Sequence, residues 1–600
     1  MHILAFVIFF GALGYWIGSA GKRRRAREKT TREIDHTLQT GLPAPQSAVG
    51  RKAQEVAEAQ ENKLSAPPPI HGSARWATAE DAASLLDGNG LVGLTGSDGL
   101  TLGYFDDLPD APGLPLVARY PGHLLTVAGT GQGKSATQIV ANLHTYRGST
   151  VVIDPKGELY RLTADHRRRF GPVYRLAPFA TEADPPTQRY NPLAELGGPR
   201  ERPARARQLA EMLIVRQGDK GAAEASFFEN EAINLLTLLI LGAVEIAESV
   251  REPERATLTE VRHNCSLPIL GDRKERDPTI RAYFEDMLRL YAERGQSELV
   301  RRQGRSFLGR EHKLLSSFLS EINSNLAFFD GHPGFSEVSA ASDFRFADLA
   351  REPTTVYVTV PLKETHTSFR YLRAMIGCAF AALEEQAEAE RASVLFILDE
   401  FPALRDMPFM RDAVAQMRSS GAWFWFFVQD VAQLEAVYGP WANVFLSQTD
   451  HQVYFGATQD KRTTRHISDC LGTGTFAYRD PDVTWSHSIG VNDSTNSTPV
   501  QMGGVGQGRN VGQSINITEP VRLAPKPLMT PFEVGTFLSE RAPGESHPAN
   551  TLILSKQAGG FPIRARRRHW RQVVDREPPS SEGHSGDVDA QSVARQGRCG

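Results

Sequence analysis

Cysteine is scarce in this chain, with four among 600 residues, and the four lie far apart in the sequence. Because no two of them form a CxxC pair, the sequence argues against a disulfide framework and against a zinc site. A reducing cytosol suits the bulk of the chain. The four are Cys265, Cys378, Cys470 and Cys599.

The chain also lacks an excess of positive charge. It has 67 Lys and Arg against 70 Asp and Glu, which gives a net charge of -3 at pH 7. The protein as a whole is therefore no polycation, and any contact with nucleic acid must come from local patches. With 600 residues, 40% of them hydrophobic, the chain is long enough for two or three domains and a large core.

Charge is absent from residues 3–18. Extended to Gly21, this apolar run approaches the roughly 20 residues that cross a bilayer. A cleaved signal peptide is the competing interpretation, but such peptides carry positive charge before the apolar run. Here the basic cluster of residues 22–29 follows it, which places residue 22 onward in the cytoplasm by the positive-inside rule. The sequence therefore predicts a transmembrane anchor over residues 1–21.

Polar segments follow this anchor and close the chain. Residues 22–70 are charged and bear proline, which is typical of a cytoplasmic linker. Residues 575–600 have almost no large apolar side chains, so we predict a disordered tail.

Glycine is concentrated in residues 123–135, where an apolar run ends in a glycine-rich turn followed by Lys134, Ser135 and a helix-like segment. This is the layout of a phosphate-binding loop, because glycines leave backbone N–H groups open to phosphate. Lys134 can reach the β- and γ-phosphates and Ser135 can ligate Mg²⁺. One departure is Ala128 in place of the usual first glycine, and an ordinary glycine-rich turn is the alternative. The predicted nucleotide-binding residues are Gly129, Thr130, Gly131, Gln132, Gly133, Lys134 and Ser135.

Apolar strand-like runs alternate with helical stretches through much of the chain. Near-continuous apolar strands separated by helices predict an α/β fold with a parallel sheet covered on both faces. Ligands of such sheets bind at the carboxyl ends of the strands. The predicted strands are residues 149–153, 354–360, 394–398, 423–428 and 451–455.

Polar side chains follow two of these predicted strands. Asp399 and Glu400 come directly after residues 394–398. We expect Asp399 to hold Mg²⁺, directly or through water, and Glu400 to polarise the attacking water. Gln429 ends the next strand and is expected to contact the γ-phosphate or the water, although a simple strand cap is the alternative.

Arg418 lies just before the strand that ends in Gln429. An arginine inserted beside the γ-phosphate contributes roughly 10³–10⁵ in rate in phosphoryl transfer. Arg418 could reach the nucleotide of a neighbouring subunit in a ring. A surface arginine or an ion pair explains its position equally well.

The strand pattern stops between residues 193 and 325, where apolar residues recur at helical spacing. Arginines in this region, among them Arg301, Arg305 and Arg310, suit either phosphate contacts or solvated helix faces. Residues 478–518 are rich in Ser, Asn, Gly and Thr and are predicted to form exposed loops, with a hairpin as the alternative. Near the C-terminus, Arg564, Arg566, Arg567, Arg568 and Arg571 surround Trp570, a composition that suits single-stranded nucleic acid or a domain end.

Taken together, these motifs resemble the TraG-like coupling proteins of type IV secretion and conjugation systems. The resemblance spans about residues 70–570 and includes the phosphate loop, the Asp399–Glu400 pair and Gln429. Typical members have two membrane helices, whereas this chain has one apolar segment at its amino terminus. The further matching segments are residues 71–76, 154–158, 190–193, 527–531 and 562–565.

The resemblance implies an inner-membrane ATPase with a RecA-like core that uses ATP and Mg²⁺ and assembles as a homohexamer. Family members pass single-stranded DNA, usually with a bound relaxase, or effector proteins to a type IV secretion channel. In this resemblance Arg418 matches the trans-acting arginine. The implied nucleotide-binding domain has two parts, residues 71–193 and 326–574, with an all-α domain inserted over residues 194–325.

Two other functions remain open at this point. One is a docking receptor for secretion substrates, in which ATP binding acts as a switch with little motor activity. The other is an FtsK-type DNA translocase, whose usual four membrane spans and carboxy-terminal winged-helix module do not match this sequence.

Overall fold

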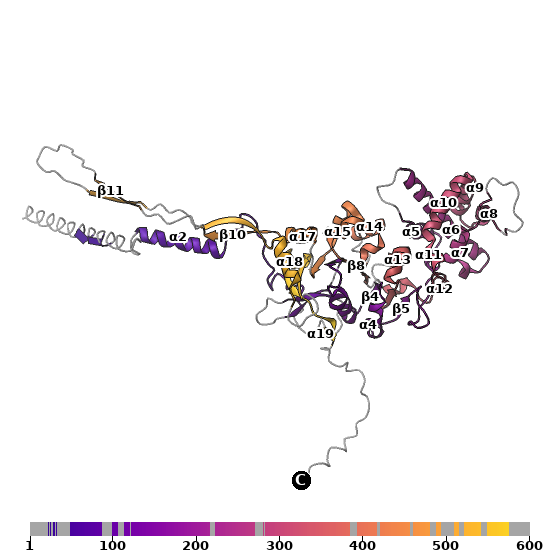
Figure 1. Ribbon diagram of the computed structural model, residues 1–600, viewed down its shortest axis with the longest axis horizontal. Coiled ribbons are helices and arrows are strands. Elements are labelled where there is room, and N and C mark those ends of the chain that lie inside the picture. Colours follow the sequence, from indigo (N-terminus) through magenta and orange to yellow (C-terminus); the bar gives the residue numbers. More distant parts are fainter. Residues whose placement is uncertain are drawn as a thin grey trace, which may run out of the picture. The chain divides into compact units, whose positions relative to one another are not determined.

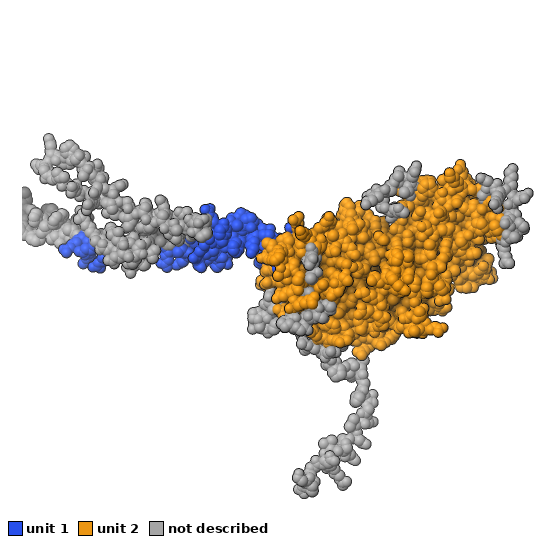
Figure 2. Space-filling model, in the orientation of Figure 1, with its two compact units in different colours: residues 1–75, 469–529 blue, residues 76–468, 530–600 orange. Residues whose placement is uncertain are grey.

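The computed structural model divides into two compact units, residues 1–75 with 469–529, and residues 76–468 with 530–600 (Figure 2). The predicted anchor, residues 1–21, and the predicted tail, residues 575–600, lie outside the described residues. The structure describes residues 22, 24–25, 28–29, 32, 48–86, 99–105, 113–119, 122–215, 223–270, 280, 282–384, 393–416, 421–456, 460–479, 488–493, 509–514, 521–541 and 549–574.

The larger unit is built on an 11-stranded sheet with the order β2-β1-β15-β14-β9-β3-β8-β7-β4-β6-β5. The strands from β9 to β5 run parallel, which confirms the predicted α/β class. The strands are β1 Leu100–Phe105, β2 Leu114–Ala118, β3 Leu124–Ala128, β4 Ser149–Ile153, β5 Val173–Leu176, β6 Thr355–Val358, β7 Val394–Leu398, β8 Ala422–Val428, β9 His451–Phe455, β14 Asn550–Ser555 and β15 Ile563–Arg566.

The sheet is mixed: the strands predicted to be parallel are parallel, and an antiparallel edge adjoins them. There β14 pairs antiparallel with β9 and β15, and β15 pairs antiparallel with β1, which pairs antiparallel with β2. A short connection through the 3₁₀ turn η11, Lys556–Ala558, joins β14 to β15. Antiparallel neighbours can be joined this closely, whereas a parallel pair needs a long crossover.

The central strands are buried along their whole length. Every residue of β3, β4 and β7 is buried, because helices pack against the sheet. Trp425 of β8 is completely buried, and its indole N–H donates to Thr126 Oγ1 at 2.9 Å, so its polar atom is satisfied. The flanking helices include α3 Val140–Thr145, α4 Glu158–Arg167, α13 Leu362–Glu384, α14 Pro408–Gln416, α15 Val431–Tyr438, α16 Ala442–Gln448, α17 Lys461–Leu471, α18 Pro531–Ser539 and α19 Trp570–Val574.

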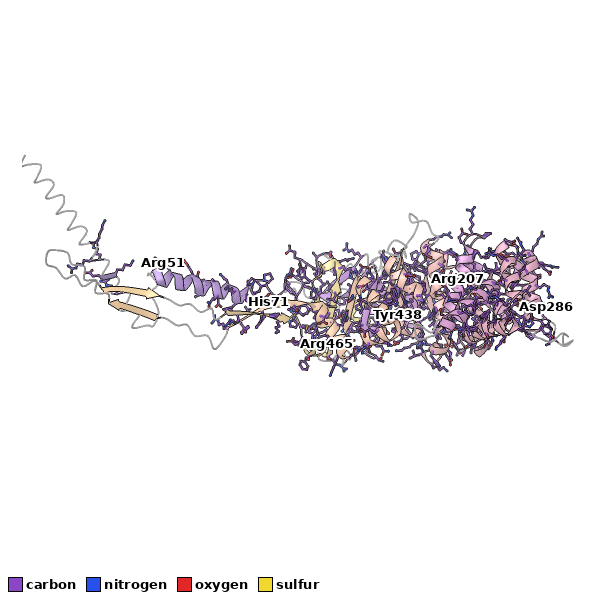
Figure 3. The ribbon with its side chains drawn as sticks, turned by 90° about the horizontal axis from the view of Figure 1, so that it is seen from above. Arg51, His71, Arg207, Asp286, Tyr438 and Arg465 are labelled. Carbon is purple, nitrogen blue, oxygen red and sulfur yellow. The ribbon has the colours of Figure 1, made fainter. Side chains whose placement is uncertain are left out.

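A helical region gathers at one end of the larger unit, where Figure 3 labels Arg207 and Asp286 (Figures 1 and 3). Its central helix is α6, which packs against α5, α7, α9 and α10. Among the described residues, the Ser226–Ser249 part of α6 is the one helix long and apolar enough to span a bilayer, but most of it is buried inside the protein. The helices are α5 Arg202–Leu213, α6 Ala223–Ser249, α7 Leu258–Cys265, α8 Phe284–Arg294, α9 Glu298–Leu308, α10 His312–Leu326, α11 Phe328–Gly331 and α12 Gly334–Val338.

In the described part of the smaller unit, helix α2 accompanies two strand pairs. β10 Thr473–Arg479 pairs with β13 Val521–Pro527, and β11 Ser488–Asp493 pairs with β12 Arg509–Ser514. α2 Ala48–Ser65 contacts the first pair, and Arg479 Nη2 lies 2.6 Å from Glu61 Oε2. Residues 478–518 therefore include the antiparallel pair β11 and β12, which agrees with the hairpin given as the alternative to exposed loops. Their polar composition lacks the apolar alternation that marks a strand with one buried face.

A buried histidine makes this fold sensitive to acid. His451 opens β9, is 0% exposed and has its Nδ1 at 2.9 Å from Ser555 Oγ. Burial, with a smaller effect from the charge of Lys556, lowers its pKa from 6.5 to about 4. Between these two pH values the unfolded chain binds a proton that the folded chain does not, so stability is lost as pH falls through this window.

We therefore expect the Tm of the protein to fall between pH 7 and pH 5, and to fall less in His451→Gln. Circular dichroism melts at intermediate pH values measure both slopes. His166, whose pKa burial also lowers to about 4, stays in the variant, so some slope remains. Identical slopes in the two proteins would contradict the assignment to His451.

Candidate nucleotide site

The glycine-rich loop follows β3, a strand that lies between β9 and β8 in the sheet. Gly131 and Gly133 have φ angles of 72° and 82°, which side chains other than glycine rarely adopt. The π-helical turn η2, Ser135–Ile139, starts directly after the loop and leads into α3. The N–H and Oγ1 of Thr137 both donate to the Gly133 carbonyl, at 2.9 and 2.8 Å. The chain therefore forms the strand–loop–helix arrangement in which backbone N–H groups receive phosphate.

Lys134 of this loop meets the acid that follows β7. Its Nζ lies 3.8 Å from Glu400 Oε2, and the two side chains are 10% and 22% exposed. Glu400 has φ 60° and ψ 44°, a left-handed conformation that costs a non-glycine residue on the order of 1–3 kcal/mol. Strained residues of this kind cluster at functional sites, and this one lies at the carboxyl edge of the parallel strands.

Gln429 joins the same group. It follows β8, which lies between β3 and β7, and its Nε2 donates to Glu400 Oε1. Its backbone N–H donates to Gln433 Oε1 at 3.1 Å. The side chains of Lys134, Glu400 and Gln429, predicted from three separate motifs, thus form one connected group.

Asp399 lies beside this group in a half-buried position. Burial raises the pKa of its carboxyl to about 6, Lys134 opposes this rise, and Glu400 adds to it. Around this carboxyl the charges of Asp154 and Glu400 act against those of Lys134 and Lys156, so three acids with two lysines suit a further cation. The hydroxyl of Ser135 and the carboxylate of Asp399 are hard oxygen donors of the kind that Mg²⁺ prefers.

Such a cation would need donors from outside the protein. Among the described residues, no group of three or more His, Cys, Asp or Glu side chains could hold a metal ion. Mg²⁺ is usually bound by one or two protein oxygens together with waters and substrate phosphates. The donor set of Ser135 and Asp399 therefore fits a nucleotide-bound Mg²⁺ and not an all-protein metal centre.

Arg418, the candidate trans-acting arginine, lies outside the described residues. Its role stays a prediction. The remaining predicted site residues, Gly129, Thr130 and Gln132, lie in the loop between β3 and η2.

Two residues near the site were given no nucleotide role from the sequence. Asp154 follows β4, the neighbour of β7, and accepts the N–H of Tyr160 at 2.9 Å, so it caps the start of α4. Arg567, at the end of β15, donates to the loop through the Gln132 carbonyl and Thr137 Oγ1. Asp154 directly follows a predicted strand, and this position was a sequence signal that could have placed it near the site. No local pattern indicates Arg567, whose partners lie 435 and 430 positions away.

The arginines around Trp570 make many of their contacts with other residues of the larger unit. The Arg564 guanidinium lies 4.9 Å from the Trp76 ring centroid, and that of Arg568 lies 4.2 Å from the Tyr104 ring centroid. Arg567 is buried against the loop. These internal contacts favour a packing role over a single-stranded nucleic-acid surface for this cluster.

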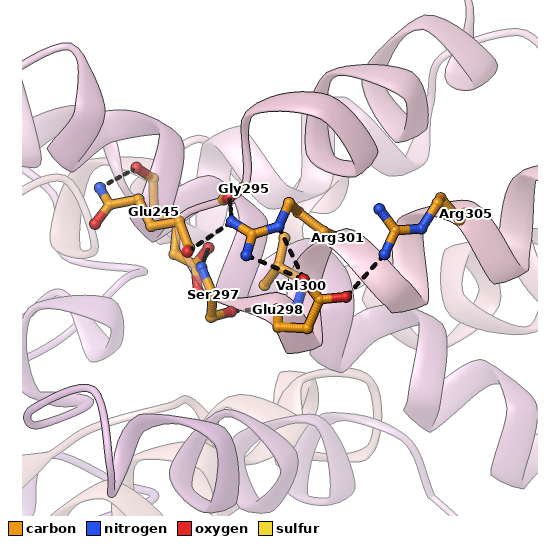
Figure 4. A network of polar contacts seen from close by, with 8 residues as sticks. Glu245, Gly295, Ser297, Glu298, Val300, Arg301 and Arg305 are labelled. Atoms are coloured by element: carbon orange, nitrogen blue, oxygen red, sulfur yellow. Dashed lines mark hydrogen bonds and ion pairs between the residues drawn. The ribbon is translucent and has the colours of Figure 1, made fainter.

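The arginines of the helical region are also engaged. Arg301 contacts Glu298 and donates to the Gly295 carbonyl at 2.7 Å, and Arg305 Nη2 lies 2.8 Å from Glu298 Oε1 (Figure 4). Arg310 Nη2 lies 3.1 Å from Glu231 Oε2. Partly neutralised side chains of this kind suit the solvated helix face better than a phosphate track.

Comparison with known proteins gives a consistent result. Residues 95–501 match the family described as type IV secretory system conjugative DNA transfer. Protein VirD4 of Agrobacterium fabrum is 27% identical over 390 residues, which cover 62% of this chain and 53% of VirD4. Conjugal transfer protein TraG of Escherichia coli is 29% identical over 388 residues, which cover 61% of this chain and 58% of TraG. The chain thus spans little more than half the length of these relatives.

Solved structures share the fold. The bacterial conjugative coupling protein TrwBdeltaN70, unbound, matches with a TM-score of 0.54 and 14% identity over 85% of this chain and 95% of its own. Plasmid coupling protein TrwB in complex with the non-hydrolysable ATP analogue ADPNP matches with a TM-score of 0.55 and 14% identity, over 85% of this chain and 96% of its own. At this identity the likeness establishes the fold.

Proposed function

The chain belongs to the type IV secretory system conjugative DNA transfer family, and from this premise we propose that it is an ATPase that couples substrates to a type IV secretion channel. The observation that carries the proposal is the group formed by Lys134, Glu400 and Gln429. These side chains come from the carboxyl ends of β3, β7 and β8, which are neighbours in the sheet. This is the edge at which α/β sheets bind ligands.

ATP with Mg²⁺ is the proposed cofactor pair. The loop from Gly129 to Ser135 would cradle the phosphates, and Ser135 and Asp399 would hold Mg²⁺, which neutralises charge on the phosphate oxygens when bound. Plasmid coupling protein TrwB is known in complex with an ATP analogue, and the shared fold supports the same ligand here.

The chain's own residues divide the work of hydrolysis. Lys134, which contacts Glu400 in the structure, would exchange that carboxylate for phosphate oxygens. Glu400 would then be able to orient and polarise a water molecule through Oε2, while Gln429 donates to Oε1 of the same carboxylate. Arg418 of a neighbouring subunit would stabilise the charge that develops on the γ-phosphate.

The proposed substrate is single-stranded DNA with its relaxase, or an effector protein. The family is one of conjugative DNA transfer, and the similar protein TraG of Escherichia coli is a conjugal transfer protein. We place the cargo-facing domain in residues 194–325, the nucleotide domain in residues 71–193 and 326–574, and the inner-membrane anchor in residues 1–21, joined to the motor by residues 22–70. We also propose a homohexamer, because the role given to Arg418 requires a neighbouring subunit and the family resemblance implies six.

A second candidate function is favoured by the contact between Lys134 and Glu400. A base held by the phosphate-binding lysine would suit a nucleotide switch, in which ATP binding recruits substrates with little turnover. Most of the free energy of ATP binding would then strengthen the docking of substrates, and little would drive their movement.

One assay separates the two functions. Purified full-length protein in detergent is given MgATP with and without single-stranded DNA, and phosphate release is followed. Multiple turnover that DNA stimulates supports the coupling ATPase. Slow turnover that DNA leaves unchanged supports the switch, and no affinity for MgATP under either condition refutes both.

A further inference from the structure

A buried arginine from the C-terminal part of the larger unit reaches the phosphate loop. Arg567 follows β15 and is 4% exposed. Its Nη1 donates to the Gln132 carbonyl at 3.2 Å and to Thr137 Oγ1 at 2.7 Å. Its guanidinium lies 3.7 Å from the centroid of the Phe455 ring, which fixes the plane of the group. Arg567 therefore contacts both the loop and the helical turn that follows it.

These contacts fix the direction of two peptide groups. In a trans peptide the C=O and the N–H point in opposite directions, and the described residues contain no cis peptide bond. Because Arg567 holds the carbonyl of Gln132, the N–H of Gly133 points away from Arg567. Thr137 holds the carbonyl of Gly133 through two donors, so the N–H of Lys134 points away from Thr137. Both N–H groups belong to the part of the loop that receives phosphate.

We propose that Arg567 is a positioning residue that orients the loop peptides for phosphate, directly through Gln132 and indirectly through Thr137, so that strand β15 sets the nucleotide affinity. This inference rests on the proposed function, because it assigns a role at the same nucleotide site. In the sequence, Arg567 is one of the arginines clustered around Trp570, and the proposal gives it a role at the nucleotide site instead.

The neighbouring strands leave the loop little room to adjust alone. Gly456, directly after β9, has φ 83°, and a Cβ there would lie 2.6 Å from the Gln132 Cβ. The backbone N–H of Arg567 donates to the Ala549 carbonyl at 2.8 Å, beside β14. Because β14 pairs with both β9 and β15, a shift of this strand group would carry the loop with it.

Four variants test the proposal in the full-length protein. Arg567→Met keeps the apolar stem and removes the donors, and Thr137→Val removes the hydroxyl that links Arg567 to Gly133. The double variant tests whether they act together. Arg568→Met is the matched control, since Arg568 is the next residue along the chain and directs its guanidinium to the Tyr104 ring and the Gly113 carbonyl.

Calorimetric titration with MgADP gives the readout. We expect Arg567→Met and Thr137→Val each to raise the Kd about tenfold, as lost hydrogen bonds from a charged donor do. The double variant should raise it less than the product of the two single effects. Arg568→Met should stay within about twofold of the unaltered protein.

Steady-state kinetics separate positioning from general stabilisation. A variant that loses phosphate contacts made equally in the ground and transition states should show a raised KM, with kcat within about threefold of the unaltered protein. Arg567→Lys should recover part of the affinity, because an ammonium can still donate to one of the two oxygens. Melting of the variants without nucleotide reports any loss of folding, and Thr137→Val carries the test if Arg567→Met folds poorly.

Three results would overturn the assignment. These are an unchanged Kd in Arg567→Met, an equal loss in Arg568→Met, and fully multiplicative effects in the double variant. If the unaltered protein and Arg568→Met both fail to bind MgADP, the proposed function fails instead, and the positioning role fails with it.

Discussion

Lys134→Ala is expected to remove ATP hydrolysis, with kcat/KM falling by at least about 10³-fold, and to abolish substrate transfer. The ammonium of Lys134 is the one loop charge placed to meet the β- and γ-phosphates. Removing it also frees Glu400, which lies 3.8 Å away, and leaves the loop with uncompensated acid. Phosphate release from purified protein and transfer in cells that carry the variant measure the two losses.

Folding should survive this substitution. The contact between Lys134 and Glu400 is long, at 3.8 Å, and Glu400 keeps the amide of Gln429 as a donor when the lysine is removed, so the fold should hold. Lys363→Ala is the matched control, because Lys363 is an exposed lysine on α13. We expect both variants to melt within a few degrees of the unaltered protein. Wild-type transfer by Lys134→Ala would refute the nucleotide site, and an equal loss in Lys363→Ala would show that the assay reports something else.

The sequence predicted those parts of the site that depend on local pattern. The bounds of β4, β7 and β9 agree with the predicted runs, because an apolar strand between helices is marked within a few residues. The end of each strand then places its polar residue at one edge of the sheet. Glu400 and Gln429 were found in this way, and their contact follows from the neighbouring places of β7 and β8.

Long-range contacts could not be predicted in this way. The pairing of β14 with β9 depends on a choice among many strands, and no residue near Leu552 signals it. Arg567 looks like one member of an exposed basic run, yet it is buried, while Arg566 beside it is exposed. The alternation along β15 separates them, but which face is covered depends on the rest of the fold.

The left-handed conformation of Glu400 is another feature that could not be predicted from the sequence. A glutamate in this region of backbone space is uncommon, and the sequence offers no glycine or asparagine there as a sign. The strain is tolerated because β7 is fully buried before it and Phe401 is buried after it. Packing on both sides thus holds Glu400 in a backbone conformation that glutamate rarely adopts, and this conformation sets the position of its carboxylate.

Glu400→Gln is expected to lower kcat by about 10²–10⁴-fold, as the loss of a general base does, while MgATP still binds. Glutamine keeps the size of the side chain and can still pair with Gln429, so the site should keep its shape. It no longer competes for Lys134 or repels the γ-phosphate, so the Kd for MgATP should not rise. Single-turnover hydrolysis and calorimetric titration measure the two quantities separately.

The control for this variant is Glu435→Gln, because Glu435 lies on α15 and contacts Arg462 at 3.1 Å, in a partly exposed pair. It should hydrolyse ATP at the normal rate. If Glu400→Gln turns over normally, Glu400 is no base, and its contact with Lys134 is structural. If it loses MgATP affinity as well as turnover, the carboxylate holds the site together before chemistry begins. Loss of turnover with affinity retained is the result that only a water-activating role explains, because that role is exercised after the nucleotide has bound.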